Sequence, residues 1–401
     1  MSIQEIILKQ VREAKAAALK LALVGARDKE EALRAMARAL WAQRASILQA
    51  NRKDIACAQK AGLSRAMIDR LALNDKRVKT MVNGILDVVK LKDPVGGVLE
   101  SRKRPNGLRI DKVRTPIGVV GIIYESRPNV TADCAALCLK SGNAAVLKGG
   151  KEAIHSNKAI YRALRRALAR TRVPAGALQL VESTDRAAVT ALLGMDAFVD
   201  LIVPRGGEGL IRFVAENSLI PVVKHYKGVC HVYVSPRADL KKAEAICLNA
   251  KVQRPGTCNA MEKMLVDVKI ARKFLPGMIR RLREAGVEVR GDDATRRIVP
   301  DVKQATAGDW YEEYLDLILT VKVVHGVQEA VDHINTYGSR HSDAIVTQNR
   351  KEADAFLKGV DAACVYVNAS TRFTDGYEFG LGAEVGISTD KLHVRGPMGL
   401  E

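Results

Sequence analysis

The stretch Gly118-Val119-Val120-Gly121-Ile122-Ile123 decides the fold. A near-continuous apolar run of this kind is typical of a strand buried on both faces of a parallel sheet. A helical stretch follows at 132–140, and three more apolar stretches then alternate with helices, at 144–147, 178–181 and 198–203. Strands that alternate with helices predict a doubly wound α/β domain with right-handed crossovers.

The chain on either side of this region is organised differently. Residues 2–90 are predicted to be helical, with Asp28 as an N-cap. Asn106-Gly107 predicts a β-hairpin within residues 101–114. We expect residues 229–234 to close the first domain. A second series of apolar stretches then predicts a second α/β domain, at 264–266, 287–289, 317–324, 344–346 and 365–368.

The composition describes an ordinary globular protein, because 47% of its 401 residues are hydrophobic and 27% are charged. Its seven cysteines are an odd number without C-x-x-C spacing, which predicts neither a disulfide framework nor a zinc site. Charged residues interrupt every apolar run in residues 1–24, unlike a signal peptide. No segment has the roughly 20 apolar residues that a membrane span needs. We expect a cytoplasmic protein without a metal site.

The net charge of +19 raises the alternative of a nucleic-acid-binding protein. Its clearest concentration is at residues 161–172, where four arginines share one face of an amphipathic helix. Aromatic residues make up only 4% of the chain, too few to form stacking platforms for single strands. We interpret the charge as a solvated surface and predict no nucleic-acid partner.

The second domain begins near Val252-Gln253-Arg254-Pro255-Gly256-Thr257-Cys258-Asn259-Ala260. Pro255 and Gly256 end the preceding helix, so Cys258 is expected on a loop between a helix and a strand. A nearby cation such as Arg254 would favour the reactive thiolate. A free cysteine is more often a small buried hydrophobe, and the spacing alone favours that interpretation.

Six blocks together closely resemble the γ-glutamyl phosphate reductase (glutamate-5-semialdehyde dehydrogenase) family of the aldehyde dehydrogenase superfamily. They are YESRPNVT at 124–131, SGNAAVLKGG at 141–150, DLIVPRGG at 200–207, QRPGTCNA at 253–260, YVNASTRFTDG at 366–376 and FGLGAEVG at 379–386. The similarity runs over nearly the whole chain. The blocks around Cys258 and at 366–386 are the most specific.

The resemblance implies an NADPH-dependent reduction of L-glutamyl 5-phosphate to L-glutamate 5-semialdehyde in proline biosynthesis, with release of phosphate. It implies an aldehyde-dehydrogenase-like fold with three parts: a Rossmann-like NADPH-binding domain (1–100 and 116–235), a catalytic α/β domain (236–375) and an oligomerisation hairpin and tail (101–115 and 376–401). A homo-oligomer, and a complex with the upstream glutamate kinase, are the partners that it suggests.

The resemblance also assigns roles to individual residues. Cys258 would be the nucleophile that forms a thioester, and Asn129 would donate to the oxyanion. Without the resemblance, Asn129 is simply a turn residue after Pro128. The residues expected to bind NADP are Lys148, Gly149, Pro204, Arg205, Gly206, Gly207 and Glu313. No G-x-G-x-x-G fingerprint is present, and Gly149-Gly150 and Gly206-Gly207 are weak signals by themselves.

One departure from the superfamily bears on the reaction. Hydrolytic aldehyde dehydrogenases carry a glutamate that activates water at the position where this chain has Lys224 and His225. The missing carboxylate argues against the main alternative, a hydrolytic semialdehyde dehydrogenase, and favours phosphate as the partner of the acyl-enzyme. Candidates for substrate binding are Arg127, Lys224, His225, Arg254, Ser370, Thr371 and Arg372, with the arginines as anion clamps.

Overall fold

The computed structural model describes residues 1–391, so the last part of the predicted tail lies outside the described residues. The chain forms two compact units. The first holds residues 1–224 and 381–386, and the second holds residues 225–380 and 387–391. Within the described part of the chain, no helix is both long and apolar enough to cross a membrane.

The first unit is built on a four-stranded parallel sheet in the order β5-β4-β3-β6. The strands are β3 (Val119–Tyr124), β4 (Ala144–Gly149), β5 (Leu178–Leu180) and β6 (Leu201–Arg205). Its helices are α1 (Ile3–Leu21), α2 (Ala26–Ala42), α3 (Arg44–Lys60), α4 (Arg65–Leu71), α5 (Asp75–Lys90), α6 (Asn129–Lys140), α7 (Ile154–Leu168), α8 (Ala187–Leu193) and α9 (Glu208–Asn217). The predicted alternation of strands and helices in a doubly wound domain is confirmed.

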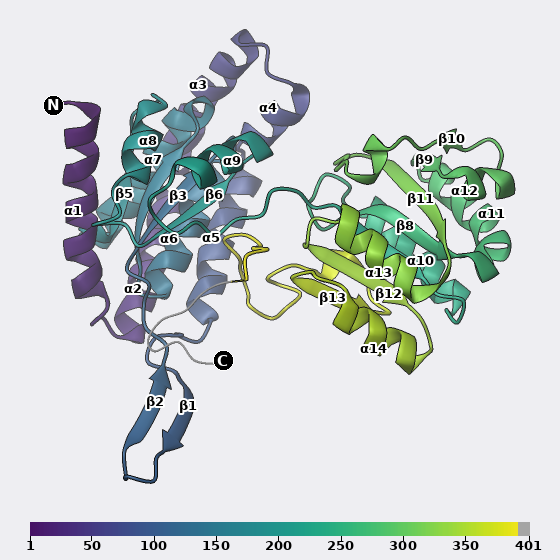
Figure 1. Cartoon of the computed structure of the whole chain (residues 1–401). Helices are drawn as coiled ribbons and strands as arrows, with labels where there is room; N and C mark the ends of the chain where they lie inside the picture. Colours follow the sequence, from purple (N-terminus) through teal and green to yellow (C-terminus); the bar gives the residue numbers. More distant parts are fainter. Residues whose placement is uncertain (392–401) are drawn as a thin grey trace. The chain divides into compact units, whose positions relative to one another are not determined.

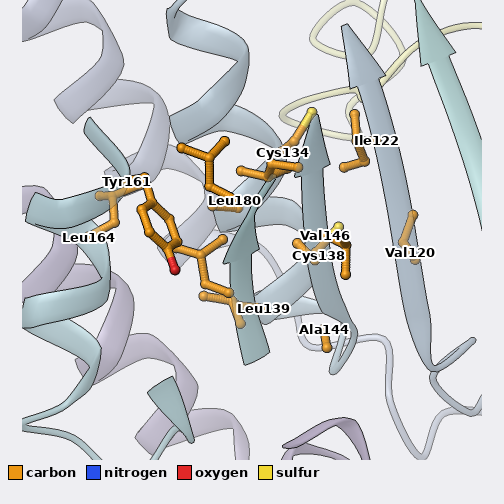
Figure 2. Close-up of a cluster of buried hydrophobic side chains, with 14 of the residues drawn as sticks. Val120, Ile122, Cys134, Cys138, Leu139, Ala144, Val146, Tyr161, Leu164 and Leu180 are labelled. Carbon is orange, nitrogen blue, oxygen red and sulfur yellow. The ribbon is translucent and has the colours of Figure 1, made fainter. Parts of the chain in front are cut away.

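The core of the first unit lies between this sheet and its helices. Figure 2 shows Val120 and Ile122 of β3 beside Cys134 and Cys138 of α6, with Tyr161 of α7 on the other side of the cluster. Burial raises the pKa of the Cys138 thiol to about 12, so this cysteine is a core residue. One local prediction is wrong: α2 begins after Gly25, and Asp28 lies in its first turn.

The predicted hairpin is confirmed. Strands β1 (Val98–Lys103) and β2 (Arg109–Val113) pair in antiparallel fashion, and Gly107 in the turn has a φ of 86°, which only glycine adopts readily. The hairpin projects from the first unit (Figure 1). It exposes five large apolar side chains: Val98, Leu99, Leu108, Ile110 and Val113. An exposed apolar patch of this kind is typical of an association surface.

The second unit is built on a seven-stranded parallel sheet in the order β10-β9-β11-β8-β7-β12-β13. The strands are β7 (Cys230–Val234), β8 (Met261–Asp267), β9 (Glu288–Gly291), β10 (Lys303–Gln304), β11 (Ile318–Val324), β12 (Ser342–Val346) and β13 (Cys364–Val367). Its helices are α10 (Leu240–Val252), α11 (Val268–Glu284), α12 (Asp293–Ile298), α13 (Gly326–Tyr337) and α14 (Arg350–Gly359).

Strand β7 corrects one prediction. Residues 229–234 were expected to close the first sheet, but β7 pairs with β8 and β12 of the second. Both faces of this sheet are covered: Val232 and Val234 pack into one core with Phe274 of α11, whereas Tyr233 packs into another with Phe356 of α14. Alternate side chains of a strand point to opposite faces, so a strand in this position must be apolar throughout.

The segments just before β7, β8 and β12 enter neighbouring strands of this sheet from the same edge, because the three strands are parallel and adjacent. His225 and Gly228 precede β7, Cys258 precedes β8 and His341 precedes β12. The fold therefore brings three distant parts of the sequence together at the amino edge of the second sheet.

Candidate active site

Cys258 lies on the loop that joins α10 to β8, as the sequence predicts. The helix ends at Val252 and the strand begins at Met261. The side chain is half-buried and is a free thiol. Held between two ordered elements and still accessible, it has the placement that a nucleophile requires.

Arg372 fixes this loop. Its guanidinium donates through Nε to Gln253 Oε1, at 3.1 Å, and through Nη1 to Asn259 Oδ1. Asn259 Nδ2 in turn donates to the carbonyl oxygen of Thr374, at 2.8 Å. Burial and the neighbouring Arg254 lower the pKa of Arg372, while attraction to Cys258 opposes that shift.

The other predicted substrate residues of the second unit lie in different environments. Arg254 is exposed on the cysteine loop. Ser370 and Thr371 are buried, and Ser370 Oγ accepts a hydrogen bond from the backbone N–H of Arg372, at 3.2 Å. Ser370 is thus the N-cap of a short 3₁₀ turn, 371–373. The roles of all three in substrate binding remain predictions.

Two histidines stand beside the thiol. The ligand atoms of His225, Cys258 and His341 all lie within 4.8 Å of one another, and the two imidazole rings meet edge to face with centroids 5.2 Å apart. His225 was a candidate from the sequence, but His341 was not. It is fully buried, and burial lowers its pKa to about 3, so the ring is neutral at physiological pH.

Gly228 lies directly against the backbone of Cys258. A Cβ at this position would be 1.8 Å from the Cys258 carbonyl oxygen and 2.5 Å from its Cα. The backbone N–H of Gly228 donates to Glu313 Oε1, at 2.9 Å. Glu313 is expected to hold the nicotinamide ribose. This hydrogen bond shows that it also anchors the segment that leads into β7, beside the nucleophile. Its contact with the cofactor stays a prediction.

Gly228→Ala is expected to lower kcat about 10²-fold, because displacing a reacting group by roughly 1 Å has an effect of that size. The new methyl group must push against the backbone of Cys258, which cannot rotate away. Steady-state kinetics on the full chain would measure the effect. Gly277→Ala is the control, since the nearest atom to its Cβ would be Glu244 Oε1, at 4.0 Å. Unchanged kcat in Gly228→Ala would contradict the tight contact.

Except for Glu313, the residues expected to bind the dinucleotide belong to the first unit, where they lie at the carboxyl ends of β4 and β6. Lys148 is buried in β4, and its Nζ donates to the carbonyl oxygen of Gly149, at 2.9 Å. Burial lowers its pKa, and Glu152 and Asp185 oppose that shift. A Cβ on Gly149 would be 2.1 Å from Nδ2 of Asn157, a buried nitrogen without a hydrogen-bond partner in the described structure. The site thus retains a polar group that a ligand would satisfy.

The loop after β6 leads into α9. Pro204 and Arg205 end the strand, and Gly206 and Gly207 lead to the first turn of the helix. Glu125 Oε2 accepts a hydrogen bond from the backbone N–H of Gly207, at 2.9 Å. A carboxylate therefore occupies the helix N-terminus, where the backbone favours anions. These residues fit the pyrophosphate of a dinucleotide, with Glu125 as the group that it would displace.

Three further predicted residues belong to the first unit. Asn129 begins α6, and its Nδ2 donates to Asp133 Oδ2, at 2.9 Å. Burial raises the pKa of Asp133 to about 6. Arg127 is exposed just before α6, and Lys224 ends the first of the two segments that make up the unit. Because Cys258 belongs to the second unit, the roles of Asn129 and Arg127 toward the substrate remain predictions.

Comparison with known proteins identifies the class of protein that this fold and cysteine loop define. Residues 2–317 match the model of the aldehyde dehydrogenase family, and the chain belongs to that family. The same fold occurs in distant structures, including an acetylating aldehyde dehydrogenase from Geobacillus thermoglucosidasius, at 19% identity and a TM-score of 0.63. The match covers 92% of this chain and 87% of the chain in that structure.

Within that family the chain groups with the γ-glutamyl phosphate reductases, so it is an oxidoreductase. The enzyme of that name from Thermodesulfovibrio yellowstonii is 53% identical over 100% of this chain and 96% of its own length. The enzyme of the same name from Moorella thermoacetica is 55% identical over 97% of this chain and 93% of its own length. The crystal structure of the Thermotoga maritima enzyme matches with a TM-score of 0.95 and 50% identity, covering 98% of this chain and 95% of that chain.

Proposed function

We propose that this chain reduces L-glutamyl 5-phosphate to L-glutamate 5-semialdehyde with NADPH and releases phosphate, as a step of proline biosynthesis. The observation that carries the proposal is the half-buried thiol of Cys258, held on a fixed loop beside His225 in a relative of the γ-glutamyl phosphate reductases. An acyl phosphate suits this nucleophile, since phosphate leaves readily and needs little help from an acid.

In this mechanism the Cys258 thiolate attacks the acyl carbon, and the bond from that carbon to the phosphate oxygen breaks. The product of this step is a thioester on Cys258. When bound, NADPH supplies the hydride that reduces the thioester, and the thiolate is then expelled as the aldehyde forms. Asn129 and the backbone N–H of Cys258 would stabilise the oxyanion in both steps. Arg127, Arg254 and Arg372 would attract the anionic substrate.

For the cofactor, Lys148 and Gly149 would contact the adenosine ribose, and the loop from Pro204 to Gly207 would face the pyrophosphate at α9. The cation of Lys148 suits the 2′-phosphate that distinguishes NADP from NAD. Glu313 would hold the nicotinamide ribose. The exposed apolar side chains of the β1–β2 hairpin support a homo-oligomer, with the hairpin as part of its interface.

The reverse reaction tests the proposal. The purified full chain would be given L-glutamate 5-semialdehyde and NADP⁺, with and without inorganic phosphate, and NADPH formation would be followed by absorbance. We expect turnover only with phosphate, because phosphate must cleave the thioester. Turnover without phosphate would mean that water cleaves it, and the hydrolytic alternative would then hold. NAD⁺ in place of NADP⁺ tests the cofactor preference.

A further inference from the structure

His225, Cys258 and His341 form a cluster of metal-ligating side chains that the proposed reaction does not require as a unit. One ligand atom from each lies within 4.8 Å of the other two. The thiol and the His225 ring are half-buried, whereas His341 is fully buried. Two of the three ligands are therefore partly accessible to an ion from solvent.

One cysteine and two histidines are side chains that commonly bind zinc. Zinc in proteins prefers cysteine sulfur and imidazole nitrogen, at about 2.3 Å and 2.0–2.1 Å, in a tetrahedron whose ligand atoms are roughly 3.5 Å apart. Side-chain rotations that move the ligand atoms by about 1 Å would bring them to the spacing of that tetrahedron. Three protein ligands leave a fourth position for water, the arrangement of an open zinc site.

A second observation points to a ligand. Nε2 of His341 is buried and has no hydrogen-bond partner in the described structure. Leaving a buried polar atom unsatisfied has a cost of about 1–3 kcal/mol, so such atoms call for an explanation. A metal ion bound through Nε2 would satisfy this nitrogen.

The surroundings orient both rings. Nδ1 of His225 lies 2.7 Å from the carbonyl oxygen of Ile387, and a carbonyl only accepts, so Nδ1 carries a proton and the neutral ring has its lone pair on Nε2. Nδ1 of His341 lies 2.9 Å from Ser342 Oγ, which contacts Thr374 Oγ1 at 2.7 Å. Metal-ligating histidines are held in this way, with the second nitrogen bonded to a carbonyl or a polar side chain.

We propose that His225, Cys258 and His341 bind one Zn²⁺ ion reversibly and that the bound ion withholds the thiol from the substrate. Binding forms a zinc–sulfur bond and releases the thiol proton to solvent. Soft thiolate and imidazole ligands select zinc and similar transition metals over Mg²⁺ and Ca²⁺, which prefer oxygen. The loss of activity rests on the proposed role of Cys258, whereas the binding itself does not.

The test is a competition titration of Zn²⁺ between the full chain and a chromophoric chelator. We expect one ion per chain, with affinity lowered at least about 10–100-fold in Cys258→Ser, His225→Gln and His341→Gln. His225→Gln changes a half-exposed residue, so it reports on the site even if a variant at the buried His341 fails to fold. His325→Ala, on the exposed start of α13, is the control and should bind zinc as the wild type does.

Cobalt provides a spectroscopic readout that does not depend on activity. Co²⁺ bound by Cys258 should show a sulfur-to-metal charge-transfer band that is absent from Cys258→Ser. Zinc affinity that is unchanged in all three variants, or no stoichiometric binding by the wild type, would overturn the proposal. An active enzyme without a zinc site would refute this inference alone, and a zinc-binding chain without reductase activity would refute only the proposed function.

Discussion

Replacing Cys258 with alanine is expected to lower the rate of phosphate-dependent NADP⁺ reduction by at least about 10⁴-fold, because loss of a nucleophile removes the covalent route. The structure indicates that the fold would not depend on the sulfur. The loop is held by Arg372 through Gln253 and Asn259 and by the carbonyl oxygen of Cys258, which accepts from Cys230 Sγ at 3.2 Å. Alanine keeps all of these contacts.

The matched control is Cys57→Ser. Cys57 is also a free cysteine, but it is exposed on α3 in the first unit. This variant should retain the wild-type rate, and both variants should unfold at the wild-type temperature. Labelling of the native chain with iodoacetamide followed by mass spectrometry would show whether Cys258 reacts. A Cys258→Ala enzyme that retains more than about one hundredth of the wild-type rate would rule out the thioester.

The sequence predicted the fold well wherever a local pattern determined the structure. The apolar run at 118–123 became β3, and the Gly207 turn set the start of α9. Residues 229–234 were correctly read as an apolar segment but assigned to the wrong sheet. A strand that is buried on both faces has the same composition in either sheet, so the pattern carries no information about which strands it pairs with.

The candidate site was predicted only in part, for a similar reason. Pro255 and Gly256 mark the cysteine loop locally, so its position could be read directly. His341 could not be found, since its approach to Cys258 depends on the adjacency of β8, β7 and β12. Arg372 was expected to clamp an anion, and the structure shows that it ties down the cysteine loop. The sequence alone does not distinguish an arginine that binds a substrate from one that binds side chains of the same protein.

A buried ion pair closes the base of the cysteine loop. Lys251 is in the last turn of α10 and Glu262 is in β8; both are fully buried, with Nζ and Oε2 2.9 Å apart. Burial raises the pKa of Glu262 to about 7, and Lys251 opposes that shift. The carboxylate also accepts a hydrogen bond from the backbone N–H of Leu315, at 3.3 Å. The pair therefore joins both ends of the segment that carries Cys258.

Glu262→Met is expected to lower the free energy of unfolding by about 3–5 kcal/mol, because the ammonium of Lys251 would remain buried without its partner. The double variant Lys251→Met/Glu262→Met should recover most of that loss, since it buries no charge. Urea denaturation of the wild type, both single variants and the double variant would measure the coupling.

The exposed pair of Arg281 and Glu244, with Nη1 and Oε2 2.7 Å apart, provides the comparison. Arg281→Ala should change the free energy of unfolding by only about 0–1 kcal/mol, because solvent screens an exposed pair. Two ion pairs of similar length in different environments thus report on the effect of burial. If Glu262→Met were no more destabilising than Arg281→Ala, water would have to reach Lys251, and the loop that holds Cys258 would be open at its base.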